Sequence, residues 1–151
     1  MQDFVHLHVH TQYSLLDGQA SVARLVDKAM KNGMKGIAVT DHGNMFGIKE
    51  FTNYVNKKNS GPKGEVKDLK KRIAGIEAGT IECEDKEAEI AACKAKIVEA
   101  ENKLFKPIIG CEMYVARRTM DLKEGKPDQS GYHLIVLAKN ETGYHNPVSY
   151  T

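Results

Sequence analysis

The sequence predicts an α/β fold in which strands of a mainly parallel sheet or barrel alternate with helices. Short runs of branched apolar residues recur along the 151-residue chain, and stretches of amphipathic, helical character separate most of them. One long stretch dense in Lys, Glu and Ala divides these runs into two groups. A chain of this length buries one modest core, so we expect a single α/β domain with a helical insertion.

The expected strands and helices of the α/β part follow in order. Ser21 is a suitable N-cap for a first helix, and Gly33 lies where a helix ends in a C-cap glycine. A second helix is expected from Met45 towards Lys57. Four strands are predicted, at residues 4–10, 35–40, 108–115 and 132–138.

Residues 59–105 form the predicted insertion. Residues 59–62, which read Asn-Ser-Gly-Pro, break the preceding pattern. Apolar residues then recur at three- and four-residue steps in two runs that Gly79 and Thr80 separate, which predicts two antiparallel helices facing each other along narrow apolar seams. The insertion is either a partner-binding arm or a solvated helical hairpin, and its interleaved acidic and basic residues favour the hairpin.

Composition excludes several classes of protein. The 22 basic and 20 acidic side chains nearly cancel, so any contact with nucleic acid would be local. The sequence contains no apolar run of membrane-spanning length and no signal sequence at its start. Cys83, Cys93 and Cys111 are widely spaced and odd in number, which argues against a disulfide framework or zinc finger and fits a cytoplasmic protein.

Alternating histidines close the first predicted strand. His6, His8 and His10 are separated by Leu7 and Val9, and side chains two residues apart in a strand point to one face, roughly 6–7 Å apart. That spacing allows His8 and His10 to converge on one metal ion. The alternative is that the histidines only pack or form hydrogen bonds in the sheet, and the pattern favours metal binding.

Further chemistry lies at the ends of the other predicted strands. His42 follows the second strand and Asp17 lies in the loop after the first, so both can reach one rim of a parallel sheet. Glu112 lies inside an apolar strand, where an unpaired carboxylate costs several kcal/mol, and therefore needs an Arg or a metal ion. His133 opens the next apolar run. Together these residues predict a site for more than one metal ion.

These motifs resemble the polymerase-and-histidinol-phosphatase (PHP) domain family. His-Val-His-Thr at residues 8–11, with Asp17 in the following loop, and Thr-Asp-His at 40–42 are similar to its first two motifs. The chain is also similar in sequence to the PHP domains found at the N-terminus of the bacterial replicative DNA polymerase III alpha family, at residues 4–11, 33–45, 106–112 and 133–144. The resemblance covers the chain except for the insertion.

The resemblance implies a partial, distorted (βα)7 barrel formed by residues 1–58 and 106–151, with the helical hairpin at 59–105 inserted. It implies up to three divalent ions, Zn, Mn or Fe, and a phosphoesterase that in some family members is a 3′–5′ proofreading exonuclease. The implied partners are DNA, the rest of a polymerase chain and other replisome subunits, without a membrane. The metal ligands, which would be catalytic through the bound ions, are His8, His10, Asp17, His42, Glu112 and His133.

The sequence also departs from the family. Three further ligands would lie beyond Thr151, and the palm, fingers and thumb that synthesise DNA are absent, so we expect a truncated N-terminal piece with weak or no catalysis of its own. A metal-stabilised scaffold without hydrolytic activity is an alternative function. A free-standing PHP phosphatase for a small phosphomonoester such as histidinol phosphate is another, although the match at residues 106–112 and 133–144 argues against it.

Other residues near these motifs receive plainer interpretations. The family does not use His6 as a ligand, so we expect it to pack. Arg117 and Arg118 follow the third predicted strand and either meet phosphate or DNA or, as we favour, lie solvated in a loop. Cys111 points away from Glu112 if both are in a strand, which predicts a core position.

Overall fold

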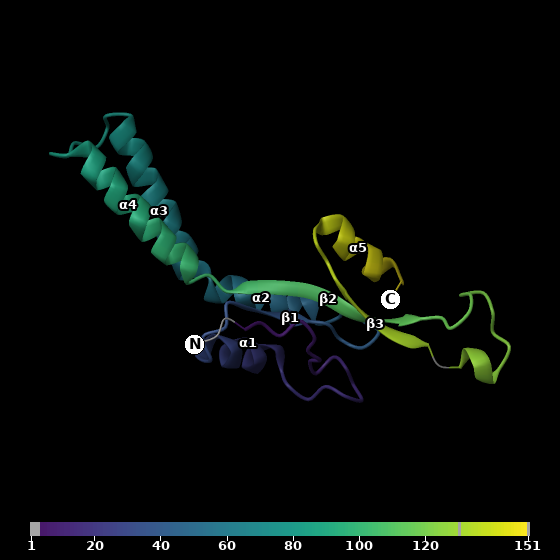
Figure 1. Cartoon of the computed structure of the whole chain (residues 1–151). Coiled ribbons are helices and arrows are strands. Elements are labelled where there is room, and N and C mark those ends of the chain that lie inside the picture. The colour runs from purple at the N-terminus through teal and green to yellow at the C-terminus, as the bar shows by residue number, and fades with distance from the viewer. Residues whose placement is uncertain (1–3, 130, 151) are drawn as a thin grey trace. The chain divides into compact units, whose positions relative to one another are not determined.

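A three-stranded mixed sheet organises the larger part of the molecule (Figure 1). The computed structural model describes residues 4–129 and 131–150. Its strands, in the spatial order β1-β2-β3, are β1 (Gly36–Val39), β2 (Lys106–Val115) and β3 (Tyr132–Leu137). β1 pairs with β2 in parallel, whereas β2 pairs with β3 antiparallel. The expectation of a mainly parallel sheet is therefore wrong for β3, because the described residues of the connection from β2, 116–129 and 131, form one short 3-10 turn at Lys126–Asp128 and no α-helix.

The predicted first strand at residues 4–10 is not part of the sheet. Two backbone hydrogen bonds hold this segment beside β1, from the N–H of Ala38 to His6 O at 2.8 Å and from the N–H of Thr40 to Val9 O at 3.0 Å. The N–H of Val9 donates to the side-chain hydroxyl of Thr40 at 3.0 Å. The prediction of a regular strand is wrong because a side chain takes a donor that a ladder would pair with a backbone carbonyl.

The first helix, α1 (Val22–Lys31), has the ends that the sequence predicts. The Ser21 hydroxyl accepts a hydrogen bond from the N–H of Arg24 at 3.4 Å, and Gly33 adopts a φ of 77° just after the helix, where a side chain would be strained. α1 packs against β1. The buried side chains of these two elements are Val22, Val26, Ala29, Ile37, Ala38 and Val39.

Two other helices flank this sheet in sequence. α2 (Ile48–Lys58) starts later than the predicted Met45, because the Asn44 side chain accepts a hydrogen bond from the N–H of Phe46 at 3.1 Å and holds the preceding residues in a turn. Phe51 of α2 is fully buried. α5 (Glu141–Tyr150) packs against β2. Among the described residues, no helix is both long and apolar enough to cross a membrane.

Residues 55–105 form a second compact unit, and residues 1–54 with 106–151 form the first. In the second unit, α3 (Ser60–Glu77) and α4 (Lys86–Asn102) pack against each other and run in opposite directions (Figure 1). Buried Ile76, Cys93 and Ala100 lie on these helices. The predicted break at 59–62 is shorter than expected, since α3 already starts at Ser60 and Pro62 occupies its first turn, where its missing N–H has no helical partner to lose.

One buried amide side chain joins the two ends of this helical pair. Asn59, which is 4% exposed, donates from Nδ2 to Phe105 O at 2.8 Å. Its Oδ1 accepts from the N–H of Phe105 at 2.9 Å. The Asn59 amide thus pairs with both the N–H and the carbonyl oxygen of Phe105, as the backbone of a residue in a neighbouring β-strand would. These two bonds satisfy backbone groups that would otherwise be buried without partners.

Replacing Asn59 with Ala is expected to lower the free energy of unfolding by about 2–3 kcal/mol, because both polar backbone groups of Phe105 lose their partners. Urea unfolding of the full chain measures this change. Asn53→Ala, at an exposed position of α2, is the control and should alter stability by less than about 0.5 kcal/mol. Equal stability of the two variants would contradict the role given to Asn59.

Candidate metal centre

The buried carboxylate of Asp41 positions the segment that carries the first two histidines. Asp41 lies two residues after the end of β1 and is 1% exposed. It accepts hydrogen bonds from the N–H of Thr11 at 2.6 Å, the hydroxyl of Thr11 at 2.8 Å and the hydroxyl of Ser14 at 2.7 Å. Bonds to a charged acceptor contribute about 1.5–3 kcal/mol each. They fix the turn at 11–14 to the end of β1, which places His10 and Asp17 on either side of that turn.

Glu112 occupies the centre of the candidate site. Its carboxylate is buried on β2 and receives His10 Nε2 at 2.6 Å and His133 Nδ1 at 2.7 Å. His42 Nδ1 lies 3.3 Å from Oε2 of the same group. The backbone brings His42 there, since the N–H of Gly43 donates to Glu112 O at 2.9 Å and continues the parallel pairing of β1 with β2.

Asp17 adds a second carboxylate on the solvent side. Its two oxygens lie 3.2 Å from His10 Nδ1 and 3.2 Å from His42 Nδ1. Because His10 Nε2 faces Glu112, both ring nitrogens of His10 face carboxylates. About half of the Asp17 side chain is exposed, so this edge of the site is open to solvent.

Opposing effects set the charge of Glu112. Burial by itself raises the pKa of its carboxyl, but the hydrogen bonds from His133 and His10 and the charges of His10 and His42 outweigh burial, so the pKa lies below its ordinary value. The group is therefore ionised near neutral pH. An ionised, buried carboxylate surrounded by imidazoles is a ligand set that divalent Zn, Mn or Fe accepts.

The positions of these nitrogen and oxygen atoms also suit the binding of a cation. Nδ1 of His42 is buried and makes no hydrogen bond, although carboxylate oxygens of Asp17 and Glu112 lie 3.2 and 3.3 Å away. A metal ion would give this nitrogen a partner. Three overlapping sets have one ligand atom of each residue within 4.8 Å of the others: His8 with His10 and Glu112, His10 with Asp17 and His42, and His42 with Glu112 and His133.

Two residues outside the predicted set orient the histidines. His8 Nδ1 lies 2.8 Å from the hydroxyl of Thr40, which leaves Nε2 of His8 as the nitrogen available to a metal. The hydroxyl of Tyr114 hydrogen-bonds Nε2 of His42, which leaves the buried Nδ1 available. The two histidines would thus bind through different ring nitrogens, and each is held by a hydroxyl on its far side.

Sequence reasoning missed these orienting residues. Tyr114 lies two residues after Glu112 in β2, and that strand spacing is a signal that could have placed it on the site's face. Thr40 precedes the Asp-His pair at the end of β1. Sequence reasoning also assigned no role to Asp41 by itself, whereas the structure shows it receiving three bonds from the turn at 11–14.

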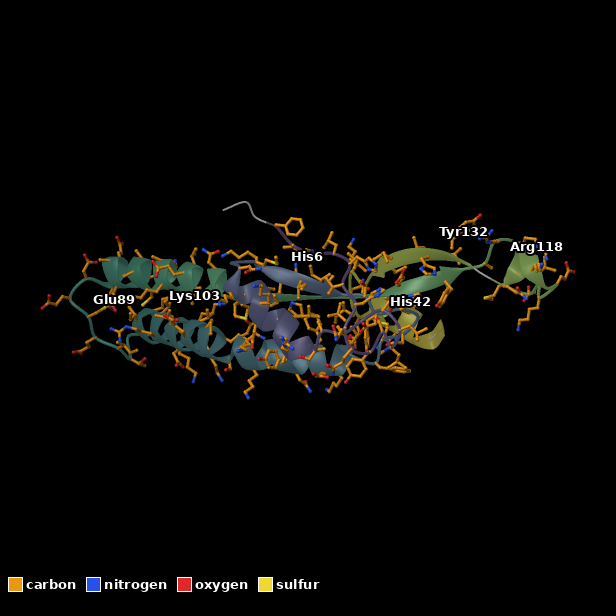
Figure 2. The ribbon with its side chains drawn as sticks, turned by 90° about the horizontal axis from the view of Figure 1, so that it is seen from below. His6, His42, Glu89, Lys103, Arg118 and Tyr132 are labelled. Carbon is orange, nitrogen blue, oxygen red and sulfur yellow. The ribbon has the colours of Figure 1, made fainter. Side chains whose placement is uncertain are left out.

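The structure separates the neighbouring candidates from the site. His6 is exposed and its ring meets that of Phe4 at 4.7 Å. Arg118 binds Asp128 at 2.6 Å and Glu124 at 3.0 Å within the loop after β2, at a distance from His42 (Figure 2). Cys111 is buried, as predicted, and burial raises the pKa of its thiol.

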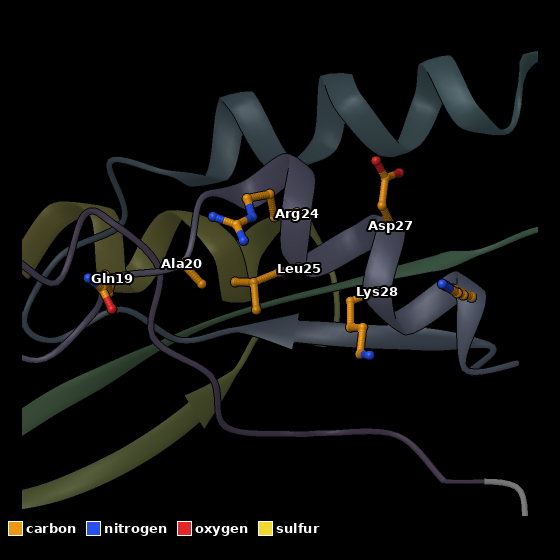
Figure 3. A pocket seen from close by; sticks show the side chains of 7 residues that line it. Gln19, Ala20, Arg24, Leu25, Asp27 and Lys28 are labelled. Atoms are coloured by element: carbon orange, nitrogen blue, oxygen red, sulfur yellow. The ribbon is translucent and has the colours of Figure 1, made fainter.

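Two cavities differ in their relation to these ligands. One of about 970 Å³ lies along α1 (Figure 3), where Arg24, Lys28 and Asp27 are among its lining residues. None of the six predicted ligands, all of which the structure describes, lines it. A smaller cavity of about 400 Å³ has Asp17 and His42 in its wall. Only this second cavity opens on the candidate metal centre.

Comparison with known proteins places the chain in a family. The chain matches the PHP domain family over residues 6–97 and 87–150, and it belongs to that family. Its curated relatives include the DNA polymerase III subunit alpha of Treponema pallidum, which is 40% identical over 144 residues, covering 95% of this chain and 8% of the relative. The corresponding subunit of Borreliella burgdorferi is 39% identical over 151 residues, covering 98% of this chain and 9% of the relative. That of Aquifex aeolicus is 31% identical and also covers 96% of the chain and 9% of its own length. The chain thus spans under a tenth of the length of these relatives.

Substituting Asp41 with Asn should lower the free energy of unfolding by about 2 kcal/mol or more, since an amide has one acceptor oxygen for the donors of Thr11 and Ser14. Thermal or urea unfolding reads out the change. Asp121→Asn in the exposed loop after β2 is the matched control. A loss no larger than in the control would show that the turn at 11–14 is held by other contacts.

Replacing Thr40 with Val should weaken metal binding about 10- to 100-fold, because His8 loses the hydroxyl that orients its ring. Thr40→Ser keeps the hydroxyl and should restore most of the affinity. Competition of the chain against a chromophoric chelator for Mn²⁺ or Zn²⁺ measures both variants. Equal weakening by Val and Ser would assign the effect to packing at this fully buried position.

Proposed function

We propose that this chain is the PHP domain of a bacterial replicative DNA polymerase and provides a metal-dependent phosphoesterase site. The observation that carries the proposal is the convergence of His10, His42 and His133 on the ionised carboxylate of Glu112. We further propose that this site, in the complete polymerase, removes nucleotides from the 3′ end of DNA. The relatives named DNA polymerase III subunit alpha support this context.

The residues of the chain have distinct roles in this proposal. Glu112 would join two ion positions, because it belongs to two of the overlapping ligand sets. His8 and His133 would complete one set each, and Asp17 would close the site on its exposed edge. A divalent ion held there lowers the pKa of a bound water and neutralises phosphoryl oxygens. Thr40 and Tyr114 keep the imidazoles in the tautomers that binding requires.

The finer architecture belongs to the same proposal. We take the three-stranded sheet as part of a distorted (βα)7 barrel formed by residues 1–58 and 106–151, with residues 59–105 as an insertion. The parallel pairing of β1 with β2 supports the barrel. Up to three ions of Zn, Mn or Fe would bind in the complete domain. DNA, the remainder of the polymerase chain and other replisome subunits would be its partners, in the cytoplasm.

A metal-stabilised scaffold is the second candidate function, and one observation favours it. The six ligands come from four separate parts of the chain, namely residues 8–17, His42, Glu112 and His133. An ion bound by all four would cross-link segments that are far apart in sequence and stabilise the fold without any hydrolysis. The two functions therefore share a metal and differ in phosphoester cleavage.

Elemental analysis of the purified chain should find about one metal ion or more per molecule, and His8→Ala should lose most of it. His6→Ala is the matched control, since its ring is exposed and packs on Phe4. In the full-length polymerase, His8→Ala should abolish release of nucleotides from a 3′ end. Loss of metal and of thermal stability with unchanged nuclease activity would instead support the scaffold.

A further inference from the structure

Residues of two chemical kinds line the cavity beside the candidate metal centre. The polar residues that line this space of about 400 Å³ include Asp17 and His42. Its apolar lining residues are Leu15, Leu16 and Phe46. Small-molecule sites commonly have volumes of roughly 300–1,000 Å³ and combine an apolar wall with a few polar groups. The cavity therefore has the size and polarity of a site for a ligand with one charged end and one apolar end.

The apolar residues that line the cavity are unusually exposed for their residue types. Phe46 is 73% exposed, Leu15 is 89% exposed and Leu16 is fully exposed. Tyr114, which is 58% exposed, also lines the cavity, and its hydroxyl hydrogen-bonds His42. The largely exposed ring of Phe46, beside the candidate metal centre, offers a flat surface on which a planar group can stack.

Hydrogen bonds hold the wall of the cavity in place. The amide of Asn44 donates to Tyr13 O at 3.1 Å and to His42 O at 3.0 Å. The Oδ1 atom of the same side chain accepts from the N–H of Phe46 at 3.1 Å. Asn44 thus connects the turn after the first histidines with the turn after β1, and fixes the position of Phe46 relative to His42.

We propose that this cavity seats one nucleotide at the end of a DNA strand, with its phosphate at Asp17 and His42 and its base against Phe46 and Leu16. The inference rests on the proposed function, because the phosphate is held through the metal. A nucleotide supplies both an anionic group, which a metal ion at Asp17 and His42 would bind, and a planar apolar group, which the apolar lining residues would contact. An apolar protein segment would cover the leucines and leave the metal edge without an anion.

The stacking surface makes this recognition tolerant of base identity. Every base has a flat π-face, and Phe46 and Leu16 offer no hydrogen-bonding group to distinguish one base from another. The base would therefore add affinity without sequence preference.

Binding of two probes to the Mn²⁺-loaded chain tests the proposal. Calorimetry compares deoxythymidine 5′-monophosphate with deoxyribose 5-phosphate, which lacks the base. The nucleotide should bind about tenfold more tightly, as expected for one stacked base. Phe46→Ala should reduce this ratio to about one, and Leu16→Ala should reduce it in part. Phe4→Ala, at another exposed phenylalanine outside the cavity, should keep the full ratio.

The outcomes separate the two levels of the argument. Two results would refute stacking of the base on Phe46 and Leu16 without affecting the proposed phosphoesterase function. One is equal binding of the two probes to the unsubstituted chain. The other is an unchanged ratio in Phe46→Ala, provided that its circular dichroism spectrum is also unchanged. Failure of both probes to bind in a metal-dependent way overturns the proposed function as well. A nucleotide preference present in the chain and absent from the full-length polymerase shows that a protein segment fills the cavity, which also overturns the inference.

Discussion

The hydrogen-bonded carboxylate of Asp41 is the interaction on which the candidate site depends. In the described part of the chain, the segment that carries His8 and His10 accepts two backbone hydrogen bonds, from Ala38 of β1 and from Thr40 just after it, and forms no regular ladder. Thr11 and Ser14 fix the end of this segment through Asp41, and Thr40 fixes its middle. The turn at residues 11–14 is thereby held at the end of β1 without regular secondary structure, because its donors bond to a buried charge.

Two buried carboxylates lie close together here, and their partners give them different roles. Asp41 is satisfied by a backbone N–H and two hydroxyls, which keep their protons at ordinary pH, so it has no need of a cation. Glu112 is satisfied by imidazoles, which can release a proton and turn a lone pair to a metal. The neighbouring groups therefore give Asp41 a structural role and suit Glu112 to metal binding, although both residues are almost equally inaccessible to water.

Sequence patterns predicted much of this candidate site, because they show where a buried polar group needs a partner and which side chains share a strand face. Glu112 was identifiable because a carboxylate in an apolar strand needs a cationic partner, and His10 because strand spacing groups alternate side chains. Thr40 could not be assigned its role, since a hydroxyl near a strand end has many possible partners. The regular strand at 4–10 was wrongly predicted for the same reason, because the apolar pattern does not show that the Thr40 side chain takes a backbone donor. The antiparallel β3 was missed because the loop before it carries no periodic signal.

The pairing of Asn59 with Phe105 has a consequence for how this domain can vary. Because one amide closes the base of the helical pair, the number of residues in α3 and α4 can change without any adjustment of the strand that follows. The six candidate metal ligands all belong to the other compact unit. The turn at residues 78–85 is thus a suitable attachment point for a fluorophore or a fused reporter, with which the protein can be followed while the residues of the candidate metal centre stay unmodified.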